Sequence, residues 1–288
     1  MSFIILTLLA AVSGCQTASH TDSSSGQHSS SAPILGPVVL HPGESVPHED
    51  QTADRPRSTR GPGVELLLGE GLSTGFAYQG AVKALHEWKV KLTSIHAYQI
   101  GALVAVSYAE TLNANRMDWS LARFSDGVLG KKTSGLVFAQ GDNIEGRIEK
   151  KLKEAYESKN ASSFKIPVIL PVQAPSPLHL WEQLRVSLVR KDYLTAYSGY
   201  SPVAYDRFRE EFLSRSEHPQ IIIEVKSSGN SELSRDEAGN VLKLTIALSN
   251  VPDLDFKRKT QAAYSGRQAM DKWKTEVLAF LRTEDRIP

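Results

Sequence analysis

Residues 63–109 read GVELLLGEGLSTGFAYQGAVKALHEWKVKLTSIHAYQIGALVAVSYA, and this stretch decides the fold. The apolar run at 64–68 has the length of a buried strand, and a second strand is expected at 92–98. Apolar residues recur at helical spacing over 76–88, and a second helix is expected at 99–111. A strand, a glycine-rich turn, a helix, a strand, a sharp turn and a helix predict parallel strands in a sheet that helices cover.

Three glycines interrupt the segment between the first strand and the first helix, namely Gly69, Gly71 and Gly75. The first turn of a helix has backbone N–H groups without partners inside the helix. Helix N-termini that face this glycine-rich loop would therefore offer N–H groups to an anion.

The stretch resembles the patatin-like phospholipase family, which has a glycine-rich oxyanion loop, a helix, and then a strand that ends in GxSxG. Gly71 and Gly75 match the loop, Gly80 matches a glycine in the helix, and Gly101 matches the last glycine of GxSxG. The resemblance covers about residues 63–281. It implies an α/β fold, a three-layer patatin-like domain with a mainly parallel sheet covered by helices.

The chain departs from this family at the residues that perform the chemistry. Gln99 stands where the family has its serine nucleophile, and Thr74 stands where it has an arginine. Glu70 and Leu72 stand where the family has loop glycines. A glutamine amide nitrogen has no useful lone pair, so Gln99 cannot act as the nucleophile.

The family's second catalytic motif, an aspartate followed by glycine shortly before Asn-x-Pro-Val, also lacks a clean counterpart. Pro202 and Val203 match its end, but Ser198 precedes the nearby glycine, and Asp192 lies too far back. Asp126, which also precedes a glycine, is too close to Gln99 in the chain and is expected in a turn that ends a helix.

The resemblance therefore implies that the chain keeps the binding pocket of the family but does not turn over a substrate. We expect a ligand or oxyanion loop formed by Gly71, Ser73, Thr74, Gly75, Gln99 and Gly101. The implied role is that of a catalytically inactive lipid-binding, acyl-binding or scaffolding protein, with a phospholipid or acyl group as the ligand. The sequence does not identify a protein partner.

Two alternatives remain open. Residues 71–75 are themselves a GxSxG between a strand and a helix, so Ser73 is a candidate nucleophile of an active serine esterase or phospholipase. The histidines available for such a triad are His86, His96, His179 and His218. Ser73 follows the first recognisable strand, however, whereas such a nucleophile normally lies deeper in the domain. The other alternative is a structural envelope protein without a ligand.

The N-terminus predicts a lipid anchor. Residues 1–15 contain a short apolar run and end in Val-Ser-Gly-Cys, which resembles the lipobox of bacterial lipoproteins. The resemblance implies that Cys15, the single cysteine of the chain, becomes acylated and attaches the protein to a membrane. The residue after the cysteine is Gln16. An aspartate at this position resembles an inner-membrane retention signal, so the glutamine leads us to expect that the protein lies in the cell envelope, attached to the outer membrane.

Residues 16–62 are rich in serine, glycine and proline and are expected to form a disordered tether before a domain at 63–288. The histidines of the tether are widely spaced, so we expect no metal site there, and no cofactor elsewhere. A short stretch at 37–40 is expected to dock locally on the domain. The net charge of +1 gives no support to nucleic-acid binding.

Further elements are expected along the rest of the domain. Helices are predicted at 113–126, from the cap Asp142 onwards, at 181–193 and at 257–281, and strands at 164–172, 220–226 and 241–248.

Overall fold

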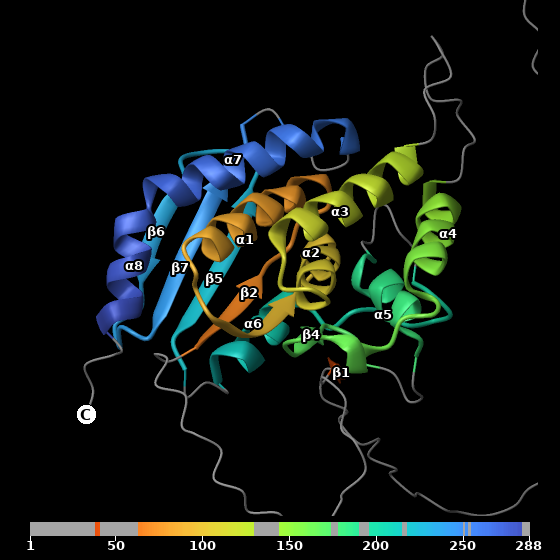
Figure 1. Ribbon diagram of the computed structural model, residues 1–288, viewed down its shortest axis with the longest axis horizontal. Coiled ribbons are helices and arrows are strands. Elements are labelled where there is room, and N and C mark those ends of the chain that lie inside the picture. The colour runs from red at the N-terminus through yellow and green to blue at the C-terminus, as the bar shows by residue number, and fades with distance from the viewer. Residues whose placement is uncertain are drawn as a thin grey trace, which may run out of the picture. The chain divides into compact units, whose positions relative to one another are not determined.

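A seven-stranded sheet with the strand order β1-β4-β3-β2-β5-β7-β6 forms the centre of the domain (Figure 1). The strands are β1 (Val38–Leu40), β2 (Val64–Leu68), β3 (Leu92–Ala97), β4 (Val168–Leu170), β5 (Gln220–Lys226), β6 (Glu232–Arg235) and β7 (Val241–Ala247). The five inner strands are parallel to one another, whereas β1 and β6 pair antiparallel at the two edges. The predicted mainly parallel sheet is confirmed, and the five strands expected from the sequence are its five inner strands.

The computed structural model describes residues 38–40, 63–129, 144–173, 178–189, 196–214, 218–249, 251–252 and 255–283. The expected signal peptide and nearly all of the expected tether lie outside these residues, as do Cys15, Asp142 and Asp192. The part of the tether that the structure describes is β1, which pairs with β4 as the expected local docking predicts.

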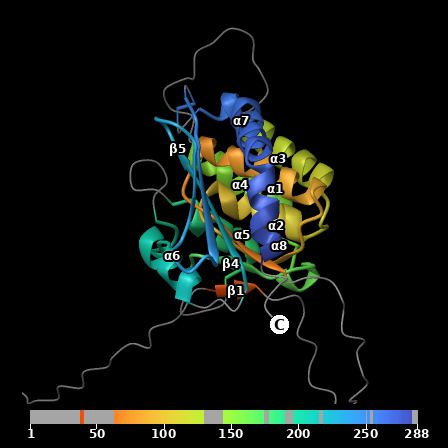
Figure 2. The same ribbon diagram turned by 90° about the vertical axis from the view of Figure 1, so that its left-hand side faces the viewer.

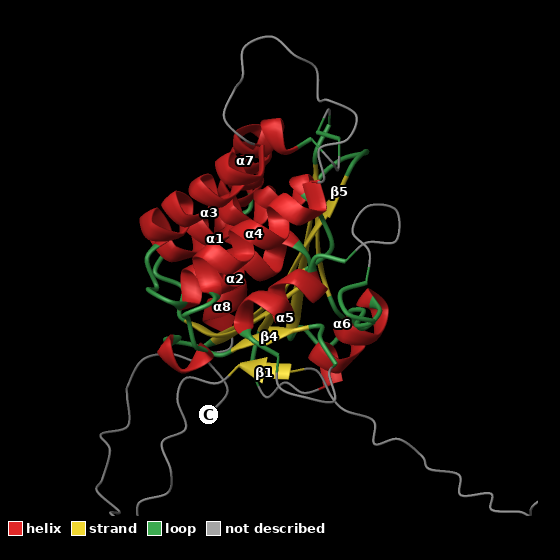
Figure 3. Ribbon diagram, turned by 90° about the vertical axis from the view of Figure 1, so that its right-hand side faces the viewer, coloured by secondary structure: helices red, strands yellow, loops and turns green. Residues whose placement is uncertain are grey.

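Helices cover both faces of the sheet, but unequally. They are α1 (Ala77–Glu87), α2 (Ile100–Ala109), α3 (Ala114–Leu129), α4 (Ile144–Tyr156), α5 (Leu180–Ser187), α6 (Tyr205–Ser214), α7 (Lys259–Lys272) and α8 (Lys274–Thr283), with short 3₁₀ turns at Ser73–Phe76, Ala161–Ser163 and Phe256–Arg258. Figures 2 and 3 show α6 on one face and the other helices on the opposite face. The result is the expected three-layer α/β arrangement. None of the described helices is long and apolar enough to cross a membrane.

The alternation of side chains along the strands produces this division. Successive residues of a strand point to opposite faces, so Leu67 and Ile222 contact the cluster around Phe208 and Phe212 of α6. Their neighbours in the same strands belong to the larger core under the other helices. The central strands therefore have apolar side chains on both faces, as expected for a parallel sheet that is buried on both sides.

Two glycines allow α1 and α7 to pack in close contact. A Cβ atom on Gly80 would lie 2.0 Å from the carbonyl oxygen of Ala263, and one on Gly266 would lie 2.0 Å from that of Ala77. The glycine that matched the family helix in the sequence thus has a packing role here, because it lets two helix backbones meet.

Several predicted boundaries are wrong. The strand expected at 164–172 is shortened to Val168–Leu170, and the helix expected at 181–193 runs from Leu180 to Ser187. The helix expected to end at Gly127 continues to Leu129, because Gly127 packs on the Lys151 side chain of α4 while Asp126 pairs with Lys259 of α7. Tertiary contacts here outweigh the weak helix propensity of glycine.

The C-terminal helix predicted at 257–281 is in fact two helices. The break falls at Trp273, which ends α7 and whose carbonyl accepts a hydrogen bond from Val277 of α8. Neither glycine nor proline marks this position, so the sequence carried no signal for the break. The predicted apolar face is nevertheless buried across both helices, at Trp273, Val277 and Phe280 among others.

Candidate functional site

A sharp turn joins β3 to α2, and Gln99 lies at its apex. The backbone of Gln99 has φ 48° and ψ −125°, a combination that non-glycine residues rarely adopt. Hydrogen bonds on both sides hold the turn: the Tyr98 N–H donates to Leu68 over 3.0 Å, and the Ile100 N–H donates to Gly71 over 3.2 Å. This strained strand-to-helix turn is the geometry in which hydrolases present a nucleophile.

The side chain of Gln99 turns back onto the glycine-rich loop. Its Oε1 accepts a 2.7 Å hydrogen bond from the backbone N–H of Gly71, and the residue is only 4% exposed. Gly71 has φ 150°, and a Cβ atom there would lie 2.8 Å from Val225 and 2.9 Å from the nitrogen of Gly75. The loop therefore needs glycine at position 71, and its N–H has Gln99 as its partner.

The other glycines of the predicted loop site bring the backbone segments together. A Cβ atom on Gly75 would lie 2.9 Å from Ile100, and one on Gly101 would lie 2.9 Å from Leu68. The first turn of α2 consequently rests directly on the loop and on the end of β2.

A cavity of about 430 Å³ opens at this turn. It is lined by Glu70, Gly71, Thr74, Gln99, Val225, Lys226 and Ser227, which follow or end the strands β2, β3 and β5. The next strand after β2 is β3, which lies on one side of it, and the next strands after β5 are β6 and β7, which lie on the other side. The cavity thus lies at a carboxyl-end switch point of the sheet, where ligands bind in open α/β folds.

The sequence did not single out the β5 side of this cavity. That side is formed by Val225, Lys226 and Ser227. Glu224, which precedes them in β5, accepts a 2.8 Å hydrogen bond from Tyr205 and forms a 2.8 Å ion pair with Lys243. Burial alone would raise the pKa of Glu224, but the hydrogen bonds from Lys243 and Tyr205 hold it below its usual value. The strand-end rule, applied to β5, is the signal that could have found these residues.

Two buried tyrosines lie beside the loop. The Tyr78 hydroxyl donates a 2.6 Å hydrogen bond to the Glu70 carbonyl, and burial followed by the charges of Glu224 and Glu70 raises its pKa well above the usual value. Burial, with a contribution from the Glu70 charge, raises the pKa of Tyr98 to about 12. Both phenols stay neutral near pH 7, so they add no charge beside the loop.

Ser73, the alternative nucleophile, is hydrogen-bonded to a backbone carbonyl rather than to a histidine. It is fully buried, and its hydroxyl donates a 2.7 Å hydrogen bond to the carbonyl of Pro252. His86 instead contacts the Tyr108 hydroxyl, and His96 packs against Phe212 on the α6 side of the sheet. Among the described residues, no histidine is hydrogen-bonded to Ser73.

The segment that matched the end of the second family motif lies next to the turn. The Tyr98 hydroxyl donates a 2.9 Å hydrogen bond to the carbonyl of Val203, so this segment contacts the residue before Gln99. Ser198, at the position of the missing aspartate, lies in an exposed turn with φ 50°, between the paired residues Tyr197 and Tyr200. The two segments that resemble the family motifs thus lie next to each other, and position 198 provides no carboxylate.

The fold and site define an α/β protein with a strained elbow and an adjoining cavity at the switch point. No protein-family model and no curated protein matches the chain. Among solved structures, it is similar to the type III effector protein ExoU, with 13% identity, a TM-score of 0.35, and coverage of 78% of this chain and 54% of ExoU. It is also similar to VipD from Legionella pneumophila, with 16% identity, a TM-score of 0.21, and coverage of 74% of this chain and 29% of VipD.

The chain thus spans about half the length of ExoU and less than a third of VipD. Both TM-scores lie below 0.5, so neither likeness assigns a family or an activity to this chain.

Proposed function

We propose that this protein is a patatin-like lipoprotein without hydrolase activity, which binds the polar end of a lipid or acyl ester at the cavity beside Gln99. One observation carries the proposal: Gln99 occupies the strained elbow, and its Oε1 accepts the hydrogen bond of the Gly71 N–H. That N–H belongs to the loop that would stabilise an oxyanion in an active member of the family.

The chemistry of the elbow supports binding without turnover. An acyl-transfer enzyme needs a nucleophile with an adjacent base and N–H donors aimed at the developing oxyanion. Here an amide replaces the nucleophile, and its own carbonyl oxygen takes the donor. The carboxylate of Glu70 lines the cavity and adds negative charge beside the loop, which opposes the charge that forms in the transition state.

The cavity supports a role in recognition. It combines backbone and amide groups at Gly71 and Gln99 with the cationic Lys226 and the hydroxyls of Thr74 and Ser227. A volume of about 430 Å³ fits a head group or an ester group. The expected acylation of Cys15 would hold the domain at the outer membrane and would supply lipids at high local concentration.

The test uses dihexanoyl phosphatidylcholine, a short phospholipid that stays monomeric in solution, and isothermal titration calorimetry. Ser227→Trp fills the exposed mouth of the cavity, and Ser228→Trp places the same side chain on the next exposed residue, outside the lining. We expect saturable binding to the wild type and to Ser228→Trp, at least tenfold weaker binding to Ser227→Trp, and no release of hexanoate. Absence of saturable binding, or equal binding by the two variants, would rule out this ligand site.

A further inference from the structure

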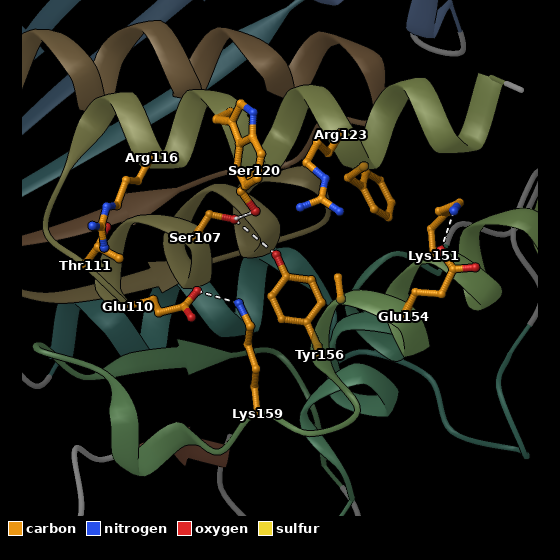
Figure 4. A pocket seen from close by; sticks show the side chains of 13 residues that line it. Ser107, Glu110, Thr111, Arg116, Ser120, Arg123, Lys151, Glu154, Tyr156 and Lys159 are labelled. Carbon is orange, nitrogen blue, oxygen red and sulfur yellow. Dashed lines mark hydrogen bonds and ion pairs between the residues drawn. The ribbon is translucent and has the colours of Figure 1, made fainter. Parts of the chain in front are cut away.

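A second and larger cavity, of about 560 Å³, lies between α2, α3 and α4 (Figure 4). Ser107 of α2 is one of the residues that line it, and it follows Gln99 by eight positions along the chain. At 1.5 Å per residue, these two positions are about 12 Å apart along the helix axis. The cavity is therefore separate from the elbow and from the function proposed for it.

One face of α3 supplies most of one wall. Arg116, Trp119, Ser120 and Arg123 line the cavity and follow one another at the spacing i, i+3, i+4 and i+7. Residues at this spacing share a face of a helix. In Figure 4 the Arg123 side chain extends from α3 toward Tyr156, beside Ser120.

The lining has an excess of positive charge. Lys159 is paired with Glu110 over 2.7 Å, and Lys151 is paired with Glu154. Arg116 and Arg123, in contrast, form no ion pair with any described residue; the Arg123 guanidinium lies over the Trp119 ring, 4.6 Å from its centroid. Two guanidinium groups thus remain for an anionic ligand.

Buried hydroxyl groups form the inner wall of the cavity. The Ser107 hydroxyl lies 3.1 Å from that of Tyr156 and 3.4 Å from that of Ser120, and Ser107 and Tyr156 are 3% and 2% exposed. Burial raises the pKa of Tyr156, so its phenol keeps its proton near pH 7 and can donate it in a hydrogen bond. Guanidinium groups together with neutral hydroxyl donors are suited to phosphate oxygens.

We propose that this cavity binds the phosphate group of a phosphate ester, held by Arg116 and Arg123 and by the hydroxyls of Ser107 and Tyr156. The cavity is larger than a phosphate group, and the Trp119 ring, 64% exposed at its rim, provides a surface for the organic part of the ligand. The ligand is either a soluble phosphate monoester or the head group of an anionic phospholipid, since both present the same oxygens.

The experiment compares two charge-matched double variants. Arg116→Gln/Arg123→Gln removes the two guanidinium groups of the cavity, and both side chains are exposed, so the fold does not depend on them. Arg207→Gln/Arg235→Gln removes two exposed arginines elsewhere in the domain and changes the net charge equally. All proteins are the full chain with Cys15→Ala, so that an acyl anchor does not contribute, and thermal melting checks that they fold.

Two probes distinguish the ligand sources: glycerol 3-phosphate, followed by calorimetry, and phosphatidylcholine vesicles with 20% phosphatidic acid, followed by sedimentation. We expect at least tenfold weaker binding of one or both probes by the cavity variant and near wild-type binding by the control variant. Loss with glycerol 3-phosphate identifies a soluble ligand, and loss with vesicles alone identifies a lipid head group. Equal weakening in the two double variants, or no binding of either probe by the parent protein, overturns the proposal.

Discussion

The backbone N–H of Gly71 donates a 2.7 Å hydrogen bond to Oε1 of Gln99, and this bond joins the glycine-rich loop to the apex of the elbow. It links two residues 28 positions apart that follow the ends of the neighbouring strands β2 and β3. The glutamine therefore both satisfies a buried backbone donor and forms the apex of a strained turn.

Two substitutions of Gln99 distinguish the contribution of its hydrogen bond to stability from the cost of its backbone strain. Gln99→Ala leaves the buried Gly71 N–H without a partner, which costs about 1–3 kcal/mol. Gln99→Gly loses the same bond but relieves the strain of φ 48°, since glycine tolerates positive φ. We expect Gln99→Gly to be more stable than Gln99→Ala by about 1 kcal/mol in urea unfolding.

The same pair of substitutions at Gln268, on the exposed side of the helix α7, serves as the control. There the order should be reversed, because glycine is less favourable than alanine in a helix by about 1 kcal/mol. If alanine were the more stable residue at position 99 as well, the elbow would not be strained.

The sequence was sufficient to predict the centre of the fold. The segments from β2 to α2 have strong local signals: a short apolar strand, a glycine-rich loop, and helical periodicity in α1. The position of Gln99 at the turn followed from the resemblance to the family motif, when its positions are counted on from Gly80. The hydrogen bond between Gln99 and Gly71 could not be predicted, since it depends on a side-chain rotamer and on the approach of two strand ends.

Elements whose stability depends on tertiary contacts were missed. The helix α6 was not predicted, although Phe208 and Phe212 at i and i+4 form the apolar face that packs on the sheet. The hairpin strand β6 has a largely exposed pattern and was missed as well. The β5 side of the cavity at the elbow escaped notice because Val225 to Ser227 acquire their role only through the strand order.

The contact between α1 and α7 should not tolerate a side chain on its glycines. Gly80→Ala would place a methyl group 2.0 Å from a backbone carbonyl, so we expect a loss of about 1–3 kcal/mol or more in unfolding free energy. Gly127→Ala is the matched control, because the three atoms nearest to a methyl group there belong to the flexible side chain of Lys151 rather than to backbone. Chemical denaturation of both variants measures the difference, and an equal effect would contradict the close packing.

Alkaline pH should destabilise the domain through Tyr98. The unfolded phenol has a pKa of 10.0, and the folded one has a pKa of about 12, so the folded state retains the proton between these values. The unfolded state binds fewer protons in this window, and the free energy of unfolding therefore falls as the pH rises through it. Tyr98→Phe should be less stable at neutral pH, through loss of the bond to Val203, but should show a shallower alkaline decline.

Ionisation of the other buried tyrosines also lowers the stability of the domain at high pH. The measured quantity is therefore the difference in unfolding free energy between the wild type and Tyr98→Phe. Urea unfolding at pH 8, 10 and 11.5 gives this difference directly. A constant difference across the series would mean that Tyr98 does not titrate differently in the two states.

Acylation of Cys15 remains a prediction from the sequence. Metabolic labelling with an alkyne-bearing fatty acid should mark the wild type and should leave Cys15→Ala unlabelled. The labelled protein should fractionate with the outer membrane, as the residue Gln16 after the cysteine suggests. Labelling that persists in Cys15→Ala, or that is missing from the wild type, would refute the lipid anchor.

The catalytic prediction concerns both candidate nucleophiles. The wild type should hydrolyse p-nitrophenyl butyrate no faster than the buffer does, and Ser73→Ala should behave identically, because the Ser73 hydroxyl is buried and donates to Pro252. A fluorophosphonate probe should label neither protein. A wild-type rate that collapses in Ser73→Ala would instead identify a serine esterase that uses Ser73.

Gln99→Ser tests whether the elbow lacks only its nucleophile. The substitution places a hydroxyl at the strained turn and frees the Gly71 N–H, a kind of donor worth about 3 kcal/mol to an oxyanion. It supplies no base, however: Ser198 stands where the family has its aspartate, and the nearby charge of Glu70 opposes an oxyanion. We therefore expect turnover to stay within tenfold of background. Efficient hydrolysis by Gln99→Ser would show that another group serves as the base and that the glutamine alone keeps this protein inactive.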